Sequence, residues 1–374
     1  MKDVFIIADN IISPLGVNSA ENIKQLRSNI SGVKKQEDSS MADQPFCASL
    51  FNKPEFSDNK TYTKFEQLLI ASIKDALSGS RIDPADKKTI LILSSTKGNI
   101  SLIENGDISP ATKQRIALHH SARLVADHFK FSHTPLVVCN ACISGSLAMI
   151  MAMRMIRSGQ YDNAVVAGAD LVSKFVLSGF QSFQAVSSEP CKPFDAARDG
   201  ISLGEGAATV ILSSNKKNKE DIAISGGALS NDANHISGPS RTGEELCQAI
   251  NAAMNDAGVT AKDIHFISAH GTATLYNDEM EAKAINLAGL QQVPVNSLKG
   301  YYGHTLGAAG LIESIITAHC MKENIVLPSF GFRELGVSLP VNIVTTIQAL
   351  NLQHCLKTAS GFGGCNAALV LSRN

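Results

Sequence analysis

The sequence predicts an α/β protein in which helices cover sheets of buried strands. Short apolar runs of strand length alternate along the 374 residues with longer stretches of helical periodicity. Hydrophobic residues make up 44% of the chain and charged residues 18%, which favours a large interior and excludes a disordered chain. The segments 207–213 (AATVILS) and 367–372 (AALVLS) resemble each other. Together these observations predict a duplicated α/β unit.

The individual elements follow from the pattern of apolar residues. The predicted strands are 4–8, 89–93, 135–139, 163–167, 207–212, 221–225, 264–269, 293–296, 355–359 and 367–371. Their nearly continuous apolar character is typical of strands covered on both faces. The predicted helices are 22–26, 63–78, 113–129, 144–157, 242–257, 278–287 and 307–321. Gly159 and Gly258 follow two of them, as expected at helix ends.

We predict two halves, residues 1–220 and 221–374. The stretch 213–221 (SSNKKNKED) is the most polar of the chain and indicates an exposed connection between them. Each half contains a strand, a tight loop and a long helix, at 137–157 and at 293–321.

Composition excludes several classes of function. A net charge of −1 gives no global field for nucleic acid or an acidic membrane. Trp is absent and aromatics are 5%, which argues against platforms for stacking bases. No apolar run reaches the roughly 18 residues of a transmembrane helix, and the run 4–8 is too short for a secretory signal. Eight scattered cysteines favour a reduced, cytoplasmic setting.

The most informative segment is 137–146 (VVCNACISGS), where a strand ends, the chain turns and a helix begins. This context predicts an elbow that lifts the Cys142 side chain above the sheet edge, beside a helix N-terminus that favours thiolate. Two other interpretations stay open: a buried structural cysteine and a redox pair with Cys139. Strand alternation is expected to bury Cys139. A zinc site would need a second pair of ligands at suitable spacing, and the sequence shows none.

Three further segments place polar or bulky residues at strand ends. His270 begins the loop HGTAT, and Lys299 and His304 lie in the glycine-rich loop 297–310. Phe362 is the one bulky residue of SGFGG. Each alone is often structural: a satisfied histidine, a surface lysine or a core aromatic. Ligands bind at the carboxyl ends of strands in open α/β sheets, so we predict that these residues converge with Cys142.

On these residues the chain resembles the β-ketoacyl-acyl carrier protein synthases, condensing enzymes of the elongating type in the thiolase-like superfamily. The motifs that carry the resemblance are IISPLG (11–16), AC (141–142), KPFD (192–195), RDG (198–200), GEGA (204–207), HGTAT (270–274), GHTLGAAG (303–310) and GFGG (361–364). The resemblance covers nearly the whole chain. It implies a thiolase-like fold whose duplicated halves form a layered α-β-α-β-α architecture.

The resemblance also implies a reaction, a decarboxylative Claisen condensation. Cys142 would take an acyl group from acyl carrier protein as a thioester, and malonyl-acyl carrier protein would lose CO₂ and attack it to give a 3-oxoacyl product. His270 and His304 match the histidine pair that assists decarboxylation and stabilises the enolate. Lys299 matches the lysine that tunes charge in the site, and Glu313 its supporting acid.

Further roles are implied for the substrate channel. The backbone N–H groups of Cys142 and Phe362 match an oxyanion hole, and Phe362 also matches the gating aromatic. Thr272 and Thr274 match the threonines that hold the phosphopantetheine arm. The resemblance implies no bound cofactor and no metal, because the arm of acyl carrier protein carries the substrates. It implies a homodimer, or a heterodimer with a related subunit, and neither nucleic acid nor membrane as partner.

The chain departs from the family pattern in ways that affect substrate choice. It is some tens of residues shorter than the usual elongating enzyme, and Ala8-Asp9-Asn10 replaces a glycine-containing run. Ser360 stands where an aromatic is common, and Cys365 where Thr is usual. Lys60 and Lys64 are expected to help dock the acidic carrier protein.

Competing members of the superfamily fit the motifs less well. A thiolase-type acyltransferase would carry a second catalytic cysteine near the C-terminal glycines, but Cys365 follows them. An initiating enzyme would carry Asn in place of His304. A largely non-catalytic partner subunit would lack the nucleophile, whereas Cys142 is present.

Overall fold

The computed structural model describes residues 2–52, 61–233 and 238–373. Eleven of the described strands share one mixed sheet, in the order β13-β11-β10-β15-β16-β9-β1-β8-β6-β4-β5. The strands of the N-terminal half are β1 (Phe5–Ile12), β4 (Thr89–Ser94), β5 (Leu136–Val138), β6 (Asn163–Asp170) and β8 (Gly206–Ser213). Those of the C-terminal half are β9 (Ile222–Asn231), β10 (Phe266–Ser268), β11 (Pro294–Asn296), β13 (Asn342–Ile343), β15 (His354–Gly361) and β16 (Cys365–Ser372).

The two halves repeat one topology. With the two-residue edge strand β13 left out, the strands numbered along each half, β5-β4-β6-β8-β1 and β11-β10-β15-β16-β9, both follow the order 3-2-4-5-1. Strand 2 is parallel to strands 3 and 4 in each half, and strand 5 is antiparallel to strands 4 and 1. The two sets of strands join where Phe5 pairs with Ala223 and Ile6 with Ile222. The predicted duplication is confirmed.

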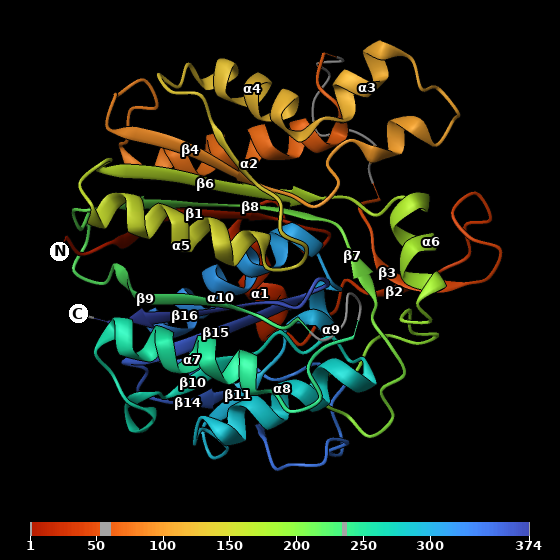
Figure 1. Ribbon diagram of the computed structural model, residues 1–374, viewed down its shortest axis with the longest axis vertical. Coiled ribbons are helices and arrows are strands. Elements are labelled where there is room, and N and C mark those ends of the chain that lie inside the picture. Colours follow the sequence, from red (N-terminus) through yellow and green to blue (C-terminus); the bar gives the residue numbers. More distant parts are fainter. Residues whose placement is uncertain (1, 53–60, 234–237, 374) are drawn as a thin grey trace.

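Helices form three layers around the two sets of strands (Figure 1). The helices are α1 (Ser19–Arg27), α2 (Lys64–Ser80), α3 (Pro110–Ile116), α4 (Leu118–Phe129), α5 (Ser144–Arg157), α6 (Lys174–Ser182), α7 (Glu244–Ala257), α8 (Leu275–Leu287), α9 (Lys299–Tyr302) and α10 (Ala309–Glu323). Helices α5 and α10 contact strands of both halves and form the central layer. Helix α2 covers β1, β6 and β8 on one outer side, and α7 covers β9 and β16 on the other. This is the expected α-β-α-β-α arrangement.

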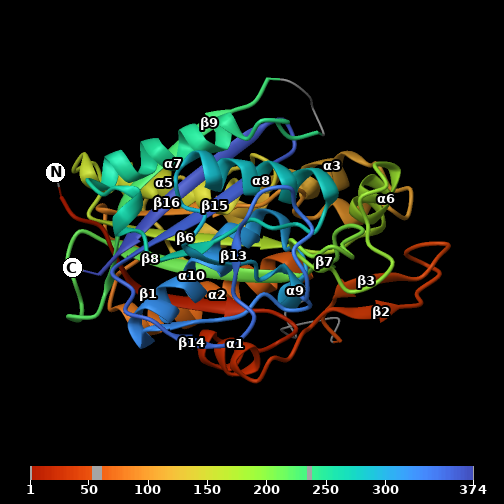
Figure 2. The same cartoon turned by 90° about the horizontal axis from the view of Figure 1, so that it is seen from below.

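Smaller elements surround these layers. They comprise the sheet of β2 (Lys34–Gln36), β3 (Phe46–Ser49) and β7 (Leu203–Gly204), the pair β12 (Ile325–Val326) and β14 (Gln348–Ala349), and the 3₁₀ turns η1 (Ile100–Ile103), η2 (Ala261–Asp263) and η3 (Leu306–Ala308). The sheet with β2 and β3 lies beside α6, at the end of the molecule opposite both termini (Figures 1 and 2).

The central helices touch at their first turns because small residues lie there. A Cβ on Gly145 would stand 2.9 Å from the Gly307 carbonyl oxygen, and one on Gly310 would stand 2.6 Å from the Ser146 nitrogen. Asp170, at the end of β6, accepts a hydrogen bond from the Gly307 N–H at 2.7 Å and fixes the start of the second helix. The loops that precede α5 and α10 are therefore held side by side.

Each predicted strand is present, with boundaries that differ by a few residues, but the helix predictions need correction. The expected helix 113–129 is two helices, α3 and α4, because Ala117 between them has extended backbone, with φ −70° and ψ 121°. Asn99 donates to the carbonyl of Arg115, whose guanidinium pairs with the buried Glu66, and these contacts hold the break. Helices α6 and α9 were not predicted.

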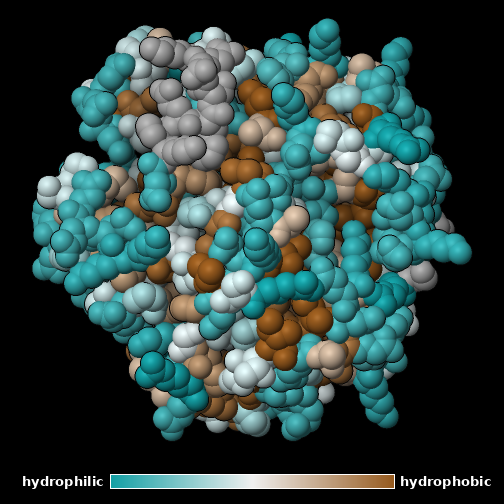
Figure 3. Space-filling model, turned by 180° about the vertical axis from the view of Figure 1, so that it is seen from behind, coloured by the Kyte–Doolittle hydropathy of each residue, from teal (hydrophilic) through white to brown (hydrophobic). Residues whose placement is uncertain are grey.

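The surface agrees with the near-neutral composition. The side of the molecule behind the view of Figure 1 is largely hydrophilic, with separate groups of hydrophobic side chains between the polar ones (Figure 3). Residues 215–220 of the predicted polar connection are exposed. Among the described residues, no helix has the length and apolar character needed to cross a membrane.

Candidate active site

Cys142 lies in a tight turn between β5 and α5. Ala141 has a φ of 43°, a left-handed conformation that residues with a side chain rarely adopt. The Ser144 hydroxyl accepts from the Asn140 N–H at 2.8 Å and donates to the Ala141 carbonyl at 2.6 Å, which fixes the turn. Cys142 is 8% exposed. The strand–turn–helix elbow therefore has the geometry that the sequence predicts.

His270 follows β10 and is held through its backbone. The carboxylate of Glu281, on α8, accepts the N–H groups of His270 at 2.8 Å and Gly271 at 2.7 Å. Gly271 has a φ of 44°, and a Cβ there would stand 2.5 Å from the Cβ of Ser297. Glycine is therefore required at this turn for both backbone conformation and space.

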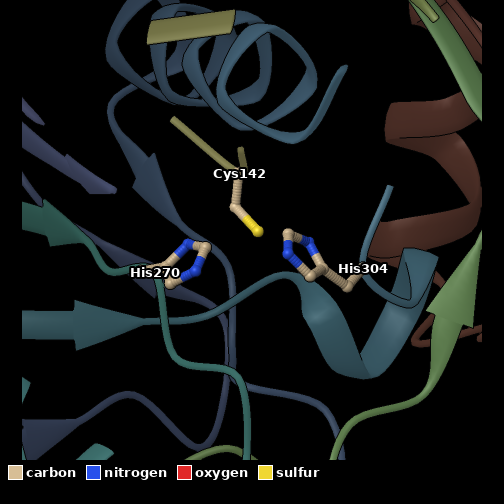
Figure 4. Close-up of side chains that lie close together, drawn as sticks. All are labelled: Cys142, His270 and His304. Atoms are coloured by element: carbon tan, nitrogen blue, oxygen red, sulfur yellow. The ribbon is translucent and has the colours of Figure 1, made fainter. Parts of the chain in front are cut away.

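His304 completes a cluster with Cys142 and His270. Its ring meets that of His270 edge to face, with centroids 5.3 Å apart. The Cys142 Sγ and one nitrogen of each ring all lie within 4.8 Å of one another, and Figure 4 shows the sulfur directed between the two rings. Neither nitrogen of the His304 ring has a hydrogen-bond partner among the described residues. The cluster is buried and its donors are available to a substrate.

Cysteine and histidine are side chains that zinc accepts as ligands, and these three lie close together. Zinc binds cysteine as the thiolate, whereas burial raises the pKa of the Cys142 thiol to about 12, so the cluster does not fit a metal site.

Lys299 lies behind the histidines and is fully buried, so the surface alternative is wrong for this residue. Its ammonium donates to the His270 carbonyl at 2.6 Å and forms an ion pair with Glu313 at 2.7 Å. It also lies 3.3 Å from Nδ1 of His270. An ammonium can only donate, so Nδ1 is the acceptor and the neutral ring carries its proton on Nε2. That proton faces away from Lys299 and is free for the reaction.

A second buried lysine was missed by the sequence analysis. Lys357 lies in the middle of β15 and forms an ion pair with Glu313 at 2.7 Å. The signal was present, since Lys357 interrupts the apolar run 355–359 that predicts a strand covered on both faces. A charge at such a position requires a buried partner.

Burial and nearby charge shift the ionisation of the cluster. Burial, followed by the charges of Lys299 and Lys357, lowers the pKa of both His270 and His304 well below 6.5. Burial raises the pKa of the Cys142 thiol to about 12, although the Lys299 charge and a hydrogen bond from the Phe362 backbone lower it. The helix terminus is expected to favour the thiolate, but desolvation outweighs this effect. Near neutral pH the cluster holds a thiol and two neutral imidazoles.

Phe362 lies in the hairpin loop between β15 and β16, and its ring is 37% exposed. It stacks on Phe180 of α6 at 5.6 Å between centroids and meets Phe183 edge to face at 5.4 Å. Gly363 and Gly364 have φ of 87° and 75°, which gives the loop a backbone that few other residues adopt. The aromatic residue is therefore at the surface, held by two rings and not packed in the core.

The two threonines lie together beside the cluster. The hydroxyl groups of Thr272 and Thr274 are 2.9 Å apart. Thr274 also caps α8 by accepting from the Asn277 N–H. Ala273 between them has a φ of 64° and is fully buried.

Cys139, Cys365 and the expected docking lysines are not part of the cluster. Cys139 is exposed, so its predicted burial is wrong: β5 ends at Val138, and alternation no longer applies. Cys365 lies in β16 with its sulfur directed at the carbonyl of Phe362. Lys60 lies outside the described residues, and Lys64 forms an ion pair with Glu205 at 3.0 Å.

Comparison with protein-family models gives two matches that cover most of the chain. The model of the beta-ketoacyl synthase N-terminal domain matches residues 1–218, and that of the C-terminal domain matches residues 222–333. The chain is 28% identical to 3-oxoacyl-[acyl-carrier-protein] synthase 2 of Rhizobium meliloti (strain 1021) and 30% identical to the protein of the same name of Vibrio cholerae. Both alignments cover 100% of this chain and 99% of the relative.

Solved structures are similar over the same length. A beta-ketoacyl synthase from Burkholderia phymatum STM815 has a TM-score of 0.91 at 24% identity and covers 100% of both chains. The ketosynthase ApeO, in complex with its chain length factor ApeC, from Xenorhabdus doucetiae has a TM-score of 0.87 at 26% identity, covering 99% of this chain and 98% of that one.

Proposed function

This chain belongs to the β-ketoacyl synthase family, and we propose that it condenses an acyl group held on Cys142 with malonyl-acyl carrier protein to give 3-oxoacyl-acyl carrier protein. One observation carries the assignment of residues: a cysteine sulfur and two neutral imidazoles share one buried site within 4.8 Å. That arrangement supplies a nucleophile and two hydrogen-bond donors around one reacting carbon. The condensation is a reaction of fatty acid or related polyketide biosynthesis.

The first step loads the enzyme. The Cys142 sulfur attacks the thioester carbon of acyl-acyl carrier protein, a new C–S bond forms, and the bond to the pantetheine sulfur breaks. The proton of the Cys142 thiol ends on the departing pantetheine sulfur. The N–H groups of Cys142 and Phe362 would stabilise the oxyanion, and the Phe362 backbone already bonds to the Cys142 sulfur.

The second step generates the carbon nucleophile. The malonyl thioester oxygen would accept hydrogen bonds from N–H groups of His270 and His304, the bond to the carboxylate carbon breaks, and CO₂ leaves. The resulting enolate attacks the Cys142 thioester, the new C–C bond forms, and the cysteine sulfur leaves as a thiolate that takes one proton from solvent to restore the thiol. The lowered pKa of both rings supports this role, because neutral imidazoles donate N–H bonds without adding charge.

Substrate delivery belongs to the same proposal. Thr272 and Thr274 would hold the phosphopantetheine arm, which enters with acyl carrier protein and is no resident cofactor. Phe362 would open and close the path between the loading and condensation steps. The exposed ring of Phe362 and the glycines after it support a moving gate.

We also propose a dimer, formed with a second copy or with a related ketosynthase-like subunit. Strand β5 ends the large sheet, and Cys139 and Asn140 beyond it are exposed. An edge strand of this kind is a natural pairing surface. A cytoplasmic setting is part of the proposal, supported by eight free cysteines, all within the described residues.

A single-turnover experiment tests the function. The enzyme is mixed with a panel of acyl-acyl carrier proteins, and intact and peptide mass spectrometry locate the acyl group. Malonyl-acyl carrier protein is then added and the 3-oxoacyl product is measured. We expect the acyl group on Cys142 and its transfer to product. An acyl group on Cys139, or no product from a loaded enzyme, would contradict the proposal.

A further inference from the structure

Lys357 contacts both Glu313 and the backbone immediately before His270. Its ammonium forms the ion pair with Glu313 and donates to the carbonyl oxygens of Ser268 at 3.2 Å and Ala269 at 3.4 Å. It also donates to the carbonyl of Thr358. The lysine thus bonds to the strand exit immediately before His270, at full burial.

Buried charges hold this strand exit on every side. Lys357 donates hydrogen bonds to the carbonyl oxygens of residues 268 and 269, and Lys299 donates one to the carbonyl oxygen of His270. Glu281 accepts the N–H groups of His270 and Gly271 and also the Thr358 hydroxyl at 2.6 Å. One strand, β15, therefore supplies both the second lysine and a hydroxyl that orients Glu281. The Lys357 bonds to the carbonyls are long, but together with the shorter bonds of Lys299 and Glu281 they restrain consecutive peptide groups of the backbone that carries the imidazole.

The second lysine also changes the charge behind the imidazoles. Glu313 would be neutralised by Lys299 alone, since their ion pair is 2.7 Å long. Lys357 adds a positive charge at the other oxygen of the same carboxylate, at 2.7 Å. Lys357 therefore places a second positive charge near the imidazoles, and this charge disfavours protonation of either ring.

We propose that Lys357 is a positioning residue for the condensation: together with Lys299 and Glu313 it fixes the strand exit that carries His270, and its charge keeps both imidazoles neutral. The inference rests on the proposed function, because it assigns Lys357 to the decarboxylation step of that reaction. It is supported by the direction in which the Lys357 charge moves the pKa of His270 and of His304, which is downward in both cases.

Other ionisable groups also surround the imidazoles. They come from each neighbouring element: Lys299 on α9, Glu313 on α10, Glu281 and Asp278 on α8, Asp170 at the end of β6, Cys365 on β16 and Cys142 before α5. Burial raises the pKa of Asp278 to about 6 and also raises that of Asp170. Glu281 and Glu313 stay paired with buried donors. Removal of Lys357 is the change that alters this balance without touching a substrate.

Two variants separate charge from position. Lys357→Met removes the charge and keeps the length of the side chain, whereas Lys357→Arg keeps the charge with a different geometry. The pKa of each histidine is read by NMR of histidine-labelled enzyme between pH 5 and 8.5, and malonyl decarboxylation and Cys142 acylation are measured over the same range. Lys262→Met, at an exposed position of η2, is the matched control.

In Lys357→Met we expect both histidine pKa values and the acid limb of decarboxylation to rise by about 0.5–1 pH unit. The kcat for decarboxylation should fall about ten-fold or more, while KM and the acylation rate stay within about two-fold. In Lys357→Arg the acid limb of the pH profile of decarboxylation should stay at the wild-type pH, although the kcat for decarboxylation falls. Lys262→Met should match wild type.

Unchanged histidine pKa values in folded Lys357→Met would overturn the proposal. So would equal losses of acylation and decarboxylation in both variants. If Lys357→Met does not fold, the arginine variant decides, since a shifted acid limb despite the retained charge would contradict the charge role. Failure of the function itself is recognised separately: wild-type enzyme would then not decarboxylate malonyl-acyl carrier protein, while the NMR titration could still be read.

Discussion

The two loops that meet at the site occupy equivalent places in the duplicated fold but contribute unequally to it. The loop 139–143, between β5 and α5, carries Cys142 and no charged side chain. The loop 297–308, between β11 and α10, carries Lys299 and His304. Duplication has kept the strand order of both halves, while the ionisable residues have gathered in the second.

This division has a chemical consequence. Burial raises the pKa of the Cys142 sulfur. The positive charge that lowers this pKa comes from Lys299, in the C-terminal half. Loading should therefore depend mainly on the first loop, and decarboxylation mainly on the second. Variants of each loop can test whether the two steps separate in this way.

The largest effect is expected for Cys142→Ala. Acyl transfer should fall by about 10³-fold or more, because no nucleophile remains. Malonyl decarboxylation should continue, because the second loop is intact. Intact mass spectrometry reports loading and CO₂ release reports decarboxylation. Cys139→Ala is the control and should keep both steps. Persistent acylation of Cys142→Ala would show that the first loop does not supply the nucleophile.

The rate of alkylation by iodoacetamide does not distinguish the nucleophile Cys142 from Cys139. Burial raises the pKa of both thiols, that of Cys142 to about 12, and Cys139 is exposed whereas Cys142 is 8% exposed, so alkylation should occur faster at Cys139. Protection by acyl-acyl carrier protein should nevertheless be specific to Cys142. Peptide mapping with and without the acyl donor measures both, and protection of Cys139 alone would argue against loading at Cys142.

The second largest effect is expected for His304→Ala. Decarboxylation should fall by about 10²–10⁴-fold, since one of two hydrogen bonds to the enolate is lost. Acyl transfer should fall by less than about ten-fold, because the sulfur and its backbone donors remain. Single-turnover measurements of each step provide the comparison. Equal losses in both steps would indicate that His304 supports the structure and not the reaction.

A third prediction concerns stability and pH. The pKa values of His270 and His304 are lowered in the folded state. Below pH 6.5 the unfolded state therefore binds more protons than the folded state, and the free energy of unfolding decreases as the pH is lowered. The loss should be about 1.4 kcal/mol per histidine and pH unit while the native rings stay neutral. Urea denaturation at pH 7.5, 6.5 and 5.5 measures it. His304→Gln should reduce the slope by about one histidine's share, and an unchanged slope would mean that this ring protonates in the native protein.

The smallest effect is expected at the surface. Lys64→Glu should raise KM for carrier-bound acyl groups about three-fold, with a dependence on salt, because the carrier is acidic. The same change also places two carboxylates side by side, since Lys64 pairs with Glu205. Lys74→Glu, at an exposed position of the same helix, is the matched control. An equal change in KM for both variants would remove Lys64 from the docking surface.

Much of the fold could be predicted because its signals are local. Buried strands give apolar runs, and the helical pattern of residues 144–157 predicts helix α5 with the bounds that it has in the structure. The expected single helix 113–129 failed because Arg115 and its neighbours are held by Glu66 and Asn99, which lie far away in the sequence. No local pattern reports such contacts.

The sequence by itself determined the fold class, the duplication and the residues at the strand ends, because apolar periodicity and glycine-rich turns are written in consecutive residues. Only the tertiary structure decided the ionisation of Cys142, the exposure of Cys139 and the partners of Lys357. These depend on how deeply each group is buried and on which charges reach it from the other half of the chain. Desolvation and pairing are properties of the assembled interior.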